Sequence, residues 1–280
     1  MNSGFVMLLI AEFCFALSTV FTKLVTNQSD IGAPEVTFFR FALGLIVVSI
    51  FVWKENISLK PFKPSLVIWR GVLNTSAVLL FFTGVEYSSV TNANMLNMTY
   101  PLFIFLFAPL LLKEKSPRIF YLFLALSMVG IYLVIHPNFS QINKGDLLAL
   151  GSGVVGAFSV MSLRMARKYD STTLILFYVM AIGFVINFII MLPVYKTPHG
   201  IVAFYAFVSA VLGVIGQIFL TRGYKYVTAK SGGIISTGRI AFATLMGLFI
   251  MGETLNFQAL IGGLLIVLAL IGVNYYSQYK

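Results

Sequence analysis

Long apolar runs fill most of this 280-residue chain and constrain its fold more than any other feature. Only 10% of the residues are charged, and they gather between runs of about twenty apolar residues, the length that crosses ~30 Å of hydrocarbon as a helix. The runs are continuous and do not alternate with a period of two, which argues against a membrane β-barrel. We therefore predict an all-α integral membrane protein with ten transmembrane helices. The expected ranges are 3–25, 34–53, 66–86, 90–112, 117–135, 145–166, 171–193, 201–224, 230–252 and 255–276.

The connections between these runs are too short to form an extramembrane domain, so we predict a single membrane domain. The first run is longer than the apolar core of a signal peptide, and we expect it to remain as the first helix. Cys14 is the only cysteine, and the two histidines, His136 and His199, lie at the ends of runs. Neither a disulfide framework nor a metal site is therefore expected. The sequence has no phosphate-binding P-loop motif, and we predict no cofactor.

The net charge of +10 is divided unevenly between the two ends of the expected helices. With the N-terminus inside, 14 basic residues lie on the inner side and 3 on the outer side, as the positive-inside rule requires. We predict a multi-pass protein of the cytoplasmic (inner) membrane with both termini cytoplasmic. No loop is long enough to build a surface for nucleic acid, which is not an expected partner. The inner set is Lys54, Lys60, Lys63, Arg70, Lys113, Lys115, Arg118, Arg164, Arg167, Lys168, Arg222, Lys225, Lys230 and Lys280, and the outer set is Lys23, Lys144 and Lys196.

A short pattern in the first half of the chain recurs 139 residues later. Each half holds five expected helices, and because five is odd, the second half must be inverted in the membrane relative to the first. We predict two inverted five-helix repeats, residues 1–139 and 140–280. Such halves can adopt two similar conformations, one open to each side, around a site near the midplane. The paired positions are Gly84 and Gly223, Tyr87 and Tyr226, Phe103 and Phe242, Leu106 and Leu245, and Glu114 and Glu253.

Several short motifs occur in an order that resembles a known family. They are Phe38-Phe39-Arg40-Phe41, Arg70-Gly71, Gly84-Val-Glu-Tyr87, Thr91-Asn-Ala93, Pro101, Leu112-Lys-Glu114 and Met251-Gly252-Glu253. This set is similar to the drug/metabolite transporter superfamily, specifically its EamA-type ten-helix members. The resemblance implies a substrate cavity lined by the first, third, fourth, sixth, eighth and ninth helices and transport of small organic metabolites. One departure is that Ile240 replaces an expected proline, and Arg239 stands where many members have a neutral residue.

Ionisable residues inside the expected helices are candidates for function, because a charge within the bilayer is costly. Glu12 and Arg239 each lie about nine residues into a helix, near the midplane at ~1.5 Å per residue. Glu12 can exchange a proton during transport or bind a cationic group; alternatively, it forms a fixed ion pair with Arg239. Arg239 can bind a substrate carboxylate or phosphate. Arg40 lies nearer the outer end, where it can reach the interface, and we expect a structural role for it.

Neutral polar and aromatic residues at a similar depth are expected to line the same cavity. Asn94, Asn97 and Pro101 share one helix face, and Phe15 and Tyr100 match the depth of Glu12. Each polar residue can instead form hydrogen bonds between helices. We predict no catalytic residues. The predicted substrate-binding residues are Glu12, Phe15, Thr19, Asn74, Asn94, Asn97, Tyr100, Gln217, Ser236 and Arg239, with Glu12 the candidate for proton coupling.

An enzyme is a disfavoured class for this chain. The pattern Gly151-Ser-Gly153-Val-Val-Gly156 matches the dinucleotide-binding fingerprint, but it lies in an apolar run with no preceding strand. We predict that these glycines, like Gly262 and Gly263, allow close helix packing. One intramembrane Glu, no intramembrane His and one Cys are poor material for a catalytic centre.

The sequence thus predicts a secondary transporter that moves a small organic metabolite across the cytoplasmic membrane by alternating access. A midplane Glu with an Arg and several Asn suits an amino acid or a related zwitterion, and transport can be proton-coupled through Glu12. The motifs of the second and third helices also resemble members that move S-adenosylmethionine. Cationic drugs, nucleosides, a channel and a membrane enzyme are the remaining alternatives. The expected partners are the substrate and the lipid bilayer, and formation of a homodimer stays open.

Overall fold

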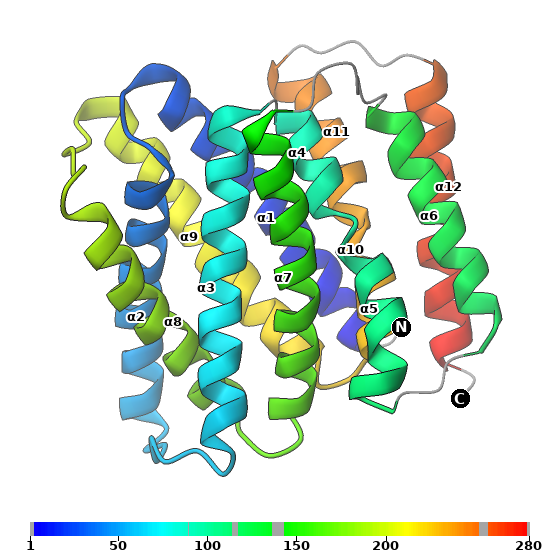
Figure 1. Cartoon of the computed structure of the whole chain (residues 1–280), viewed down its shortest axis with the longest axis horizontal. Helices are drawn as coiled ribbons and strands as arrows, with labels where there is room; N and C mark the ends of the chain where they lie inside the picture. The colour runs from blue at the N-terminus through cyan, green and yellow to red at the C-terminus, as the bar shows by residue number, and fades with distance from the viewer. Residues whose placement is uncertain (1–2, 89, 114–116, 136–142, 252–256, 279–280) are drawn as a thin grey trace.

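The computed structural model describes residues 3–88, 90–113, 117–135, 143–251 and 257–278 (Figure 1). Within these ranges the chain forms helices and no strand. Eight segments are long and apolar enough to cross a membrane, and Ile119–Val134 is a shorter apolar helix. The helices are α1 (Ser3–Gln28), α2 (Ala33–Lys54), α3 (Pro64–Tyr87), α4 (Val90–Asn97), α5 (Tyr100–Leu111), α6 (Ile119–Ile135), α7 (Lys144–Ala166), α8 (Thr172–Met191), α9 (Gly200–Gly223), α10 (Ala229–Ser236), α11 (Gly238–Met251) and α12 (Phe257–Gln278).

Two of the expected helices are each broken in the middle, which corrects the prediction of one continuous helix over 90–112 and over 230–252. α4 ends just before Tyr100-Pro101, and proline both lacks an N–H and clashes with the carbonyl one turn earlier. α10 ends at Ser236, and the hydroxyl of the next residue, Thr237, donates to the carbonyl of Ile234 at 2.7 Å. At the other break, the hydroxyl of Thr99 donates to the carbonyl of Leu96 at 2.6 Å. In both places a threonine binds a local carbonyl where the helix is interrupted.

Polar side chains fix where several helices begin. The hydroxyl of Ser171 accepts from the Leu174 amide at 3.2 Å at the start of α8. The hydroxyl of Thr228 accepts from the Ser231 amide at 3.1 Å at the start of α10. These contacts satisfy backbone donors that the first turn of a helix leaves unpaired. The short connections predicted from sequence therefore contain the N-cap residues of the helices that follow them.

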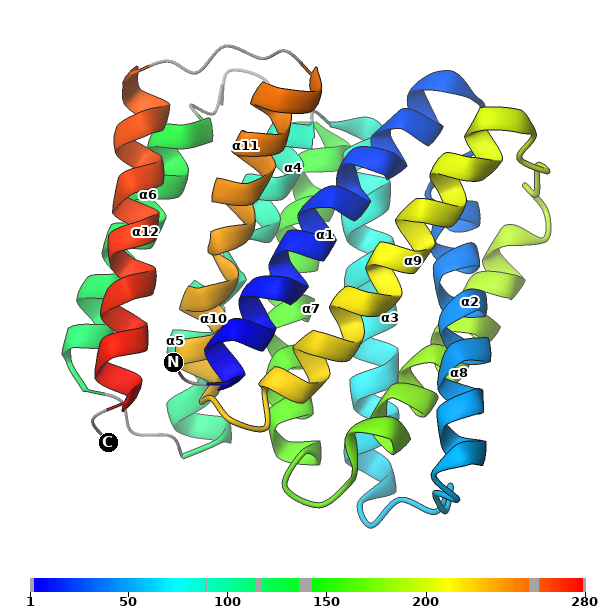
Figure 2. The same ribbon diagram turned by 180° about the vertical axis from the view of Figure 1, so that it is seen from behind.

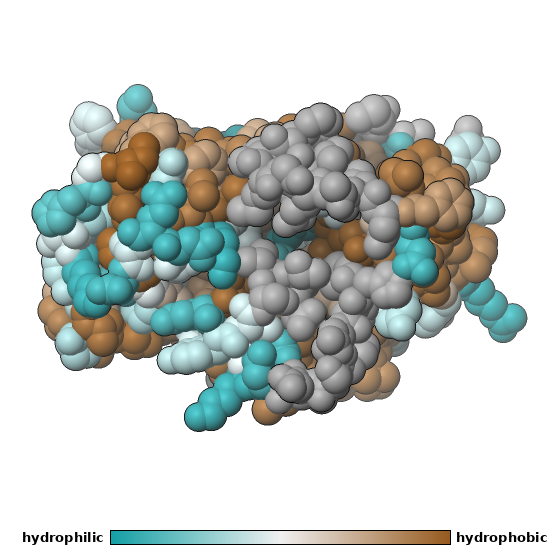
Figure 3. Space-filling view, turned by 90° about the horizontal axis from the view of Figure 1, so that it is seen from above, coloured by the Kyte–Doolittle hydropathy of each residue, from teal (hydrophilic) through white to brown (hydrophobic). Residues whose placement is uncertain are grey.

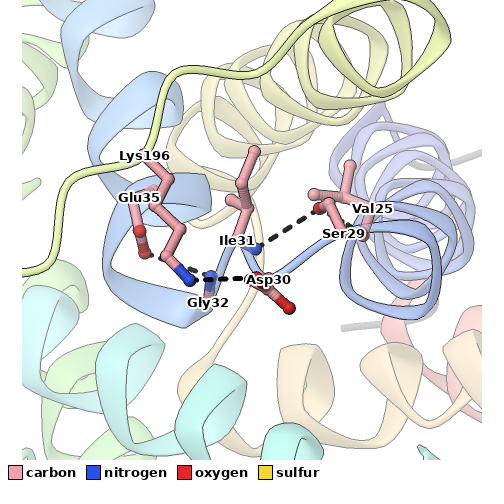
Figure 4. A network of polar contacts seen from close by, with 7 residues as sticks. All are labelled: Val25, Ser29, Asp30, Ile31, Gly32, Glu35 and Lys196. Atoms are coloured by element: carbon pink, nitrogen blue, oxygen red, sulfur yellow. Dashed lines mark hydrogen bonds and ion pairs between the residues drawn. The ribbon is translucent and has the colours of Figure 1, made fainter.

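The start of α1 and the end of α12 lie on the same side of the molecule, toward the bottom of Figures 1 and 2. We call this the lower side and the opposite one, where α3 ends, the upper side. The turn between α1 and α2 lies on the upper side, where the Gly32 amide donates to the Glu35 carboxylate at 3.1 Å (Figure 4). Lys196, in the loop between α8 and α9, forms an ion pair with Asp30 of this turn at 3.2 Å. This pair is exposed and joins the two upper connections.

Four helix pairs hold the bundle together: α3 with α7, α1 with α9, α6 with α12, and α2 with α8. Each pair joins one helix from residues 1–139 to one from residues 140–280. α3 and α7 approach so closely that a Cβ on Gly145 would lie 2.6 Å from the Gly84 carbonyl oxygen. α6 and α12 meet in the same way, because a Cβ on Gly262 would lie 2.5 Å from the Gly130 carbonyl oxygen. Small residues thus set the helix contacts, as is common in membranes.

Candidate functional site

A central cavity lies between the helices and extends toward the upper side. Its lining on α3 runs from Arg70 up to Phe82, near the upper end of that helix. The empty space, counted out to its open mouth, is about 740 Å³. Figure 3 views this upper side and shows hydrophilic residues gathered over its left part. The lining residues are Phe15, Ser18, Thr19, Arg40, Arg70, Asn74, Ala77, Val78, Phe81, Phe82, Asn97, Tyr100, Gly156, Ser159, Val160, Gln217, Leu220 and Arg239.

The structure brings most of the residues predicted for substrate binding to this cavity. Seven of them line it: Phe15, Thr19, Asn74, Asn97, Tyr100, Gln217 and Arg239. Three do not, namely Glu12, Asn94 and Ser236, which are buried beside it. The depth argument therefore predicted which part of the bundle these seven residues share, while the side chains at the other three positions do not reach the cavity.

Glu12 and Arg239 form the buried ion pair that the sequence left as one of two alternatives. The Nε and Nη2 atoms of Arg239 both approach Oε2 of Glu12, at 2.7 and 2.6 Å. The Glu12 side chain is 0% exposed, and that of Arg239 is 14% exposed. Glu12 thus stands behind Arg239 and does not face the cavity. In this conformation the guanidinium lies between the carboxylate and the cavity, so contact between Glu12 and a substrate stays a prediction.

Arg40 also faces the cavity, which corrects the expectation that it reaches the outer interface. Its side chain is buried against α9, where a Cβ on Gly213 would lie 2.8 Å from Arg40 Cδ. Its Cζ lies 5.2 Å from the ring centre of Phe15, and its Nη2 donates to the Gln217 side-chain oxygen at 3.5 Å. Gly216 leaves the room for the Phe15 ring. Gly213 and Gly216 of α9 therefore leave the space in which the Arg40 side chain and the Phe15 ring pack.

Phe15 carries a second guanidinium on its ring. The Cζ of Arg239 lies 4.9 Å from the Phe15 ring centre, so Arg40 and Arg239 both make cation–π contacts with it. Such a contact attracts a cation to the negative face of the ring. One aromatic side chain therefore holds two positive groups in the cavity wall.

Arg70 is the main functional candidate that the sequence reasoning missed, because it was counted with the basic residues of the inner side. It is the seventh residue of α3, is 1% exposed, and lines the cavity. Its Nη1 donates to the hydroxyl of Ser159 on α7. A signal was present: Asn74 follows Arg70 by four residues, so the two share one face of the helix. Asn74 lines the cavity as well.

Below the cavity, the two halves of the chain pack together and separate it from the lower side. Lys230 of α10 is 2% exposed, and its Nζ lies 5.2 Å from the ring centres of both Phe105 and Tyr121. Arg164 of α7 donates to the carbonyl of Tyr224 at 3.0 Å. The first turn of α1 lies against the end of α9 near Gly223. These contacts form a closed lower layer.

Other sequence expectations have mixed outcomes. Gly153 and Gly262 do allow close packing, whereas a Cβ on Gly151, Gly156 or Gly263 would meet nothing within 4 Å. Close packing was therefore the wrong explanation for those three glycines, and Gly156 instead lines the cavity.

In the described part of the chain, no group of three or more His, Cys, Asp or Glu residues could hold a metal ion. Glu114 and Glu253 of the repeat lie outside the described residues.

Comparison with known proteins identifies the family. A family model, the EamA-like transporter family, matches residues 2–136 and again residues 143–275. The pseudopaline exporter of Pseudomonas aeruginosa is 24% identical over 98% of this chain and 96% of the relative. Solute carrier family 35 member G1 of Homo sapiens is 25% identical over 97% of this chain and 79% of the relative. The S-adenosylmethionine uptake transporter of Rickettsia felis is 24% identical over 86% of this chain and 82% of the relative.

The fold also matches a known one. A crystal structure of another protein superimposes with a TM-score of 0.80 at 15% sequence identity, covering 100% of this chain and 99% of that chain. The family and the relatives are transporters and not enzymes. The apolar helices and these relatives make the protein a multi-pass membrane protein that transports small molecules. By its repeated match to the family model, the chain belongs to the EamA-like transporter family.

Proposed function

We propose that this protein is a secondary transporter that moves a small carboxylate-bearing metabolite, such as an amino acid or a related zwitterion, by alternating access. The observation that carries the proposal is the central cavity, in which Arg239 is held in place by the buried carboxylate of Glu12. A fixed guanidinium is well suited to bind a carboxylate through two parallel hydrogen bonds. Polar side chains such as Asn74, Asn97 and Gln217 complete the wall.

Alternating access would rest on ten membrane crossings arranged as two inverted repeats, residues 1–139 and 140–280. The two broken crossings support this division: Ala229 and Ser236, which bound α10, follow the bounds of α4, Val90 and Asn97, by 139 residues each. α4 begins on the upper side and α10 on the lower side, as inverted copies should (Figures 1 and 2). Discontinuous helices at corresponding positions of two halves are typical of transporter binding sites. The family model also matches once in each half.

The state of the cavity fits one end of such a cycle. It extends to the upper side, and the packed layer around Lys230 and Tyr224 closes it below. Basic residues gather on the lower side, which we therefore assign to the cytoplasm together with both termini. The conformation would then face outward, and the reverse state would exchange these contacts for closure at the upper side.

Among the substrate alternatives, the cavity favours an acid over a cation. Arginine guanidinium groups face it and the Glu12 carboxylate does not, so a cationic drug would meet repulsion there. The relative that carries S-adenosylmethionine keeps that substrate among the candidates.

Proton coupling through Glu12 would require the ion pair between Glu12 and Arg239 to open. Its Oε1 has no hydrogen-bond partner among the described residues, so this oxygen is available to a proton.

Uptake into proteoliposomes tests the proposal directly. The purified protein would be reconstituted and given labelled amino acids and S-adenosylmethionine, with and without unlabelled compound inside and with and without a pH gradient. We expect saturable uptake that is stimulated by internal substrate, which distinguishes a transporter from a channel. Arg222→Gln, on the exposed lower end of α9, is the matched control and should behave as wild type. Flux that never saturates, or flux equal to that of empty liposomes for every compound, would refute the proposal.

A further inference from the structure

We propose that the cavity selects substrates with at least two acidic groups, because Arg40 and Arg70 form two anion subsites that no carboxylate among the described residues neutralises. This inference rests on the proposed function and narrows its substrate class to net anions. Arg239 alone would explain one carboxylate, whereas Arg40 and Arg70 together favour two acidic groups. A dicarboxylate, or an amino acid with an acidic side chain, has the required charge.

The charges that face the cavity do not balance. Three arginines line it, and no Asp or Glu among the described residues does. Glu12 sits behind the wall and binds Arg239 through both Nε and Nη2, so this pair is locally neutral. Arg40 and Arg70 remain, and each is more than nine-tenths buried. Two positive charges in a site of low dielectric are costly, and an anion that joins them offsets this cost.

The hydrogen-bond donors of these two arginines are also incomplete. Nε and Nη2 of Arg70 are buried without a partner in the described structure, since Ser159 receives only Nη1. Nε of Arg40 is likewise unpartnered, and its contact with Gln217 is long at 3.5 Å. A guanidinium has five N–H donors, and carboxylate or phosphate oxygens match them in pairs. Both groups thus retain donors for a ligand that the cavity can admit.

The two subsites are separate. Arg40 lies seven residues from the upper start of α2 and Arg70 six residues from the lower start of α3, so each is about 10 Å inside a different end of the bundle. Their neighbours differ, since Phe15 and Gln217 hold Arg40 while Ser159 holds Arg70. A molecule with acidic groups at both ends can contact both arginines at once. A compound with one acid satisfies one of them and leaves the other unpaired.

Thermal unfolding of the purified wild-type protein with matched ligand pairs tests this without any mutation. Succinate and succinamate have nearly the same size and differ by one charge, as do glutamate and glutamine. We expect the half-maximal concentration for stabilisation to be at least about tenfold lower for the member with two acids, the effect of one further charge-assisted contact. Adding 3-phosphoglycerate tells whether a phosphate can serve as the second acid. Putrescine, a cation of similar length, should give no shift.

Variants assign the second subsite to Arg70. Arg70→Gln should reduce the preference for succinate over succinamate to about onefold, while Arg70→Lys, which keeps the charge, should retain part of it. Arg222→Gln serves as the control with an unchanged preference. Equal responses to succinate and succinamate in the wild type, or a preference that persists in Arg70→Gln, would overturn the inference. No response to any diacid would overturn it as well, and saturable uptake of a zwitterion by the same preparation would then leave the proposed function standing.

Discussion

Two arginines rest on the same phenylalanine ring, and among the described residues only one of them has a carboxylate partner. Arg239 lies 4.9 Å from the Phe15 ring centre and binds Glu12, whereas Arg40 lies 5.2 Å from it and donates to the Gln217 amide oxygen. Both contacts place a guanidinium in the cavity wall at the depth of the bilayer. The difference separates two settings of charge: the paired group joins α1 to α11, and the other group keeps an unpartnered Nε among the described residues.

This difference predicts opposite effects on stability when the paired charge and the unpaired charge are removed, although both changes should impair transport. Removing one member of a buried pair leaves the other charge uncompensated, which is strongly destabilising. Removing an unpaired buried charge removes a desolvation cost and leaves no other charge without a partner. The predictions below use this contrast, and they run from the largest expected effect to the smallest.

Glu12→Gln should have the largest effect, because it strands Arg239 in a site where Glu12 is 0% exposed. We expect a loss of about 3–5 kcal/mol in the free energy of unfolding. Uptake should fall by about two orders of magnitude, since Arg239 loses the group that positions it. Thermal unfolding and proteoliposome uptake measure the two effects on one preparation.

The double variant Glu12→Gln with Arg239→Gln is the matched control. It removes both charges, so most of the lost stability should return while uptake stays low. If the single variant unfolds at the wild-type temperature, the ion pair between Glu12 and Arg239 does not stabilise the fold. If the double variant transports normally, Arg239 does not bind the substrate.

Much of this arrangement could be predicted from residue counting. Helix length and the rise per residue set the depth of Glu12 and Arg239, and the sequence placed both near the midplane. The helix ends lie within three residues of the expected ones, apart from the two interior breaks. The depth of a residue in the bilayer depends only on its own helix, so it could be predicted without knowing the neighbouring helices.

What could not be predicted depends on contacts between helices. The room for Arg40 comes from Gly213 on α9, which is 173 residues away in the chain, so its inward direction is not encoded on α2. Arg70 was assigned to the inner side because it lies near the start of its helix. Its partner Ser159 belongs to α7 and gave no local signal. Rotation of a helix about its axis, unlike depth, is set by the neighbours that it packs against.

Arg40→Gln sharpens the contrast with Glu12→Gln. Because Arg40 has no carboxylate partner among the described residues, its loss should leave the unfolding temperature unchanged or higher. The KM for an acidic substrate should rise about tenfold, since one charged contact is lost. Kinetics of uptake and thermal unfolding separate these outcomes. A clear drop in unfolding temperature would show that Arg40 is a structural group, as the sequence alone suggested.

Phe15→Leu removes the ring that both guanidiniums share. Each cation–π contact contributes about 0.5–1 kcal/mol or more when it is shielded from water, so the KM should rise about fivefold. The matched control is Phe13→Leu on the same helix, because Phe13 is 44% exposed and contacts Phe242 away from the cavity. Equal effects of the two substitutions would mean that Phe15 acts through packing and not through its two cations.

The smallest effect is expected at the ion pair between Lys196 and Asp30, which has the same chemistry as the buried pair in a different setting. Its N–O distance of 3.2 Å is comparable, yet the two side chains are 54% and 88% exposed. Water and salt screen charges at such positions, so Lys196→Gln should change the free energy of unfolding by less than about 1 kcal/mol. Thermal unfolding at low and high salt checks this, and the difference from wild type should vanish at high salt. If Lys196→Gln lowers the free energy of unfolding as much as Glu12→Gln does, burial does not set the strength of these ion pairs. The burial of Arg40 and Arg70 would then give no reason to infer that they bind an anion.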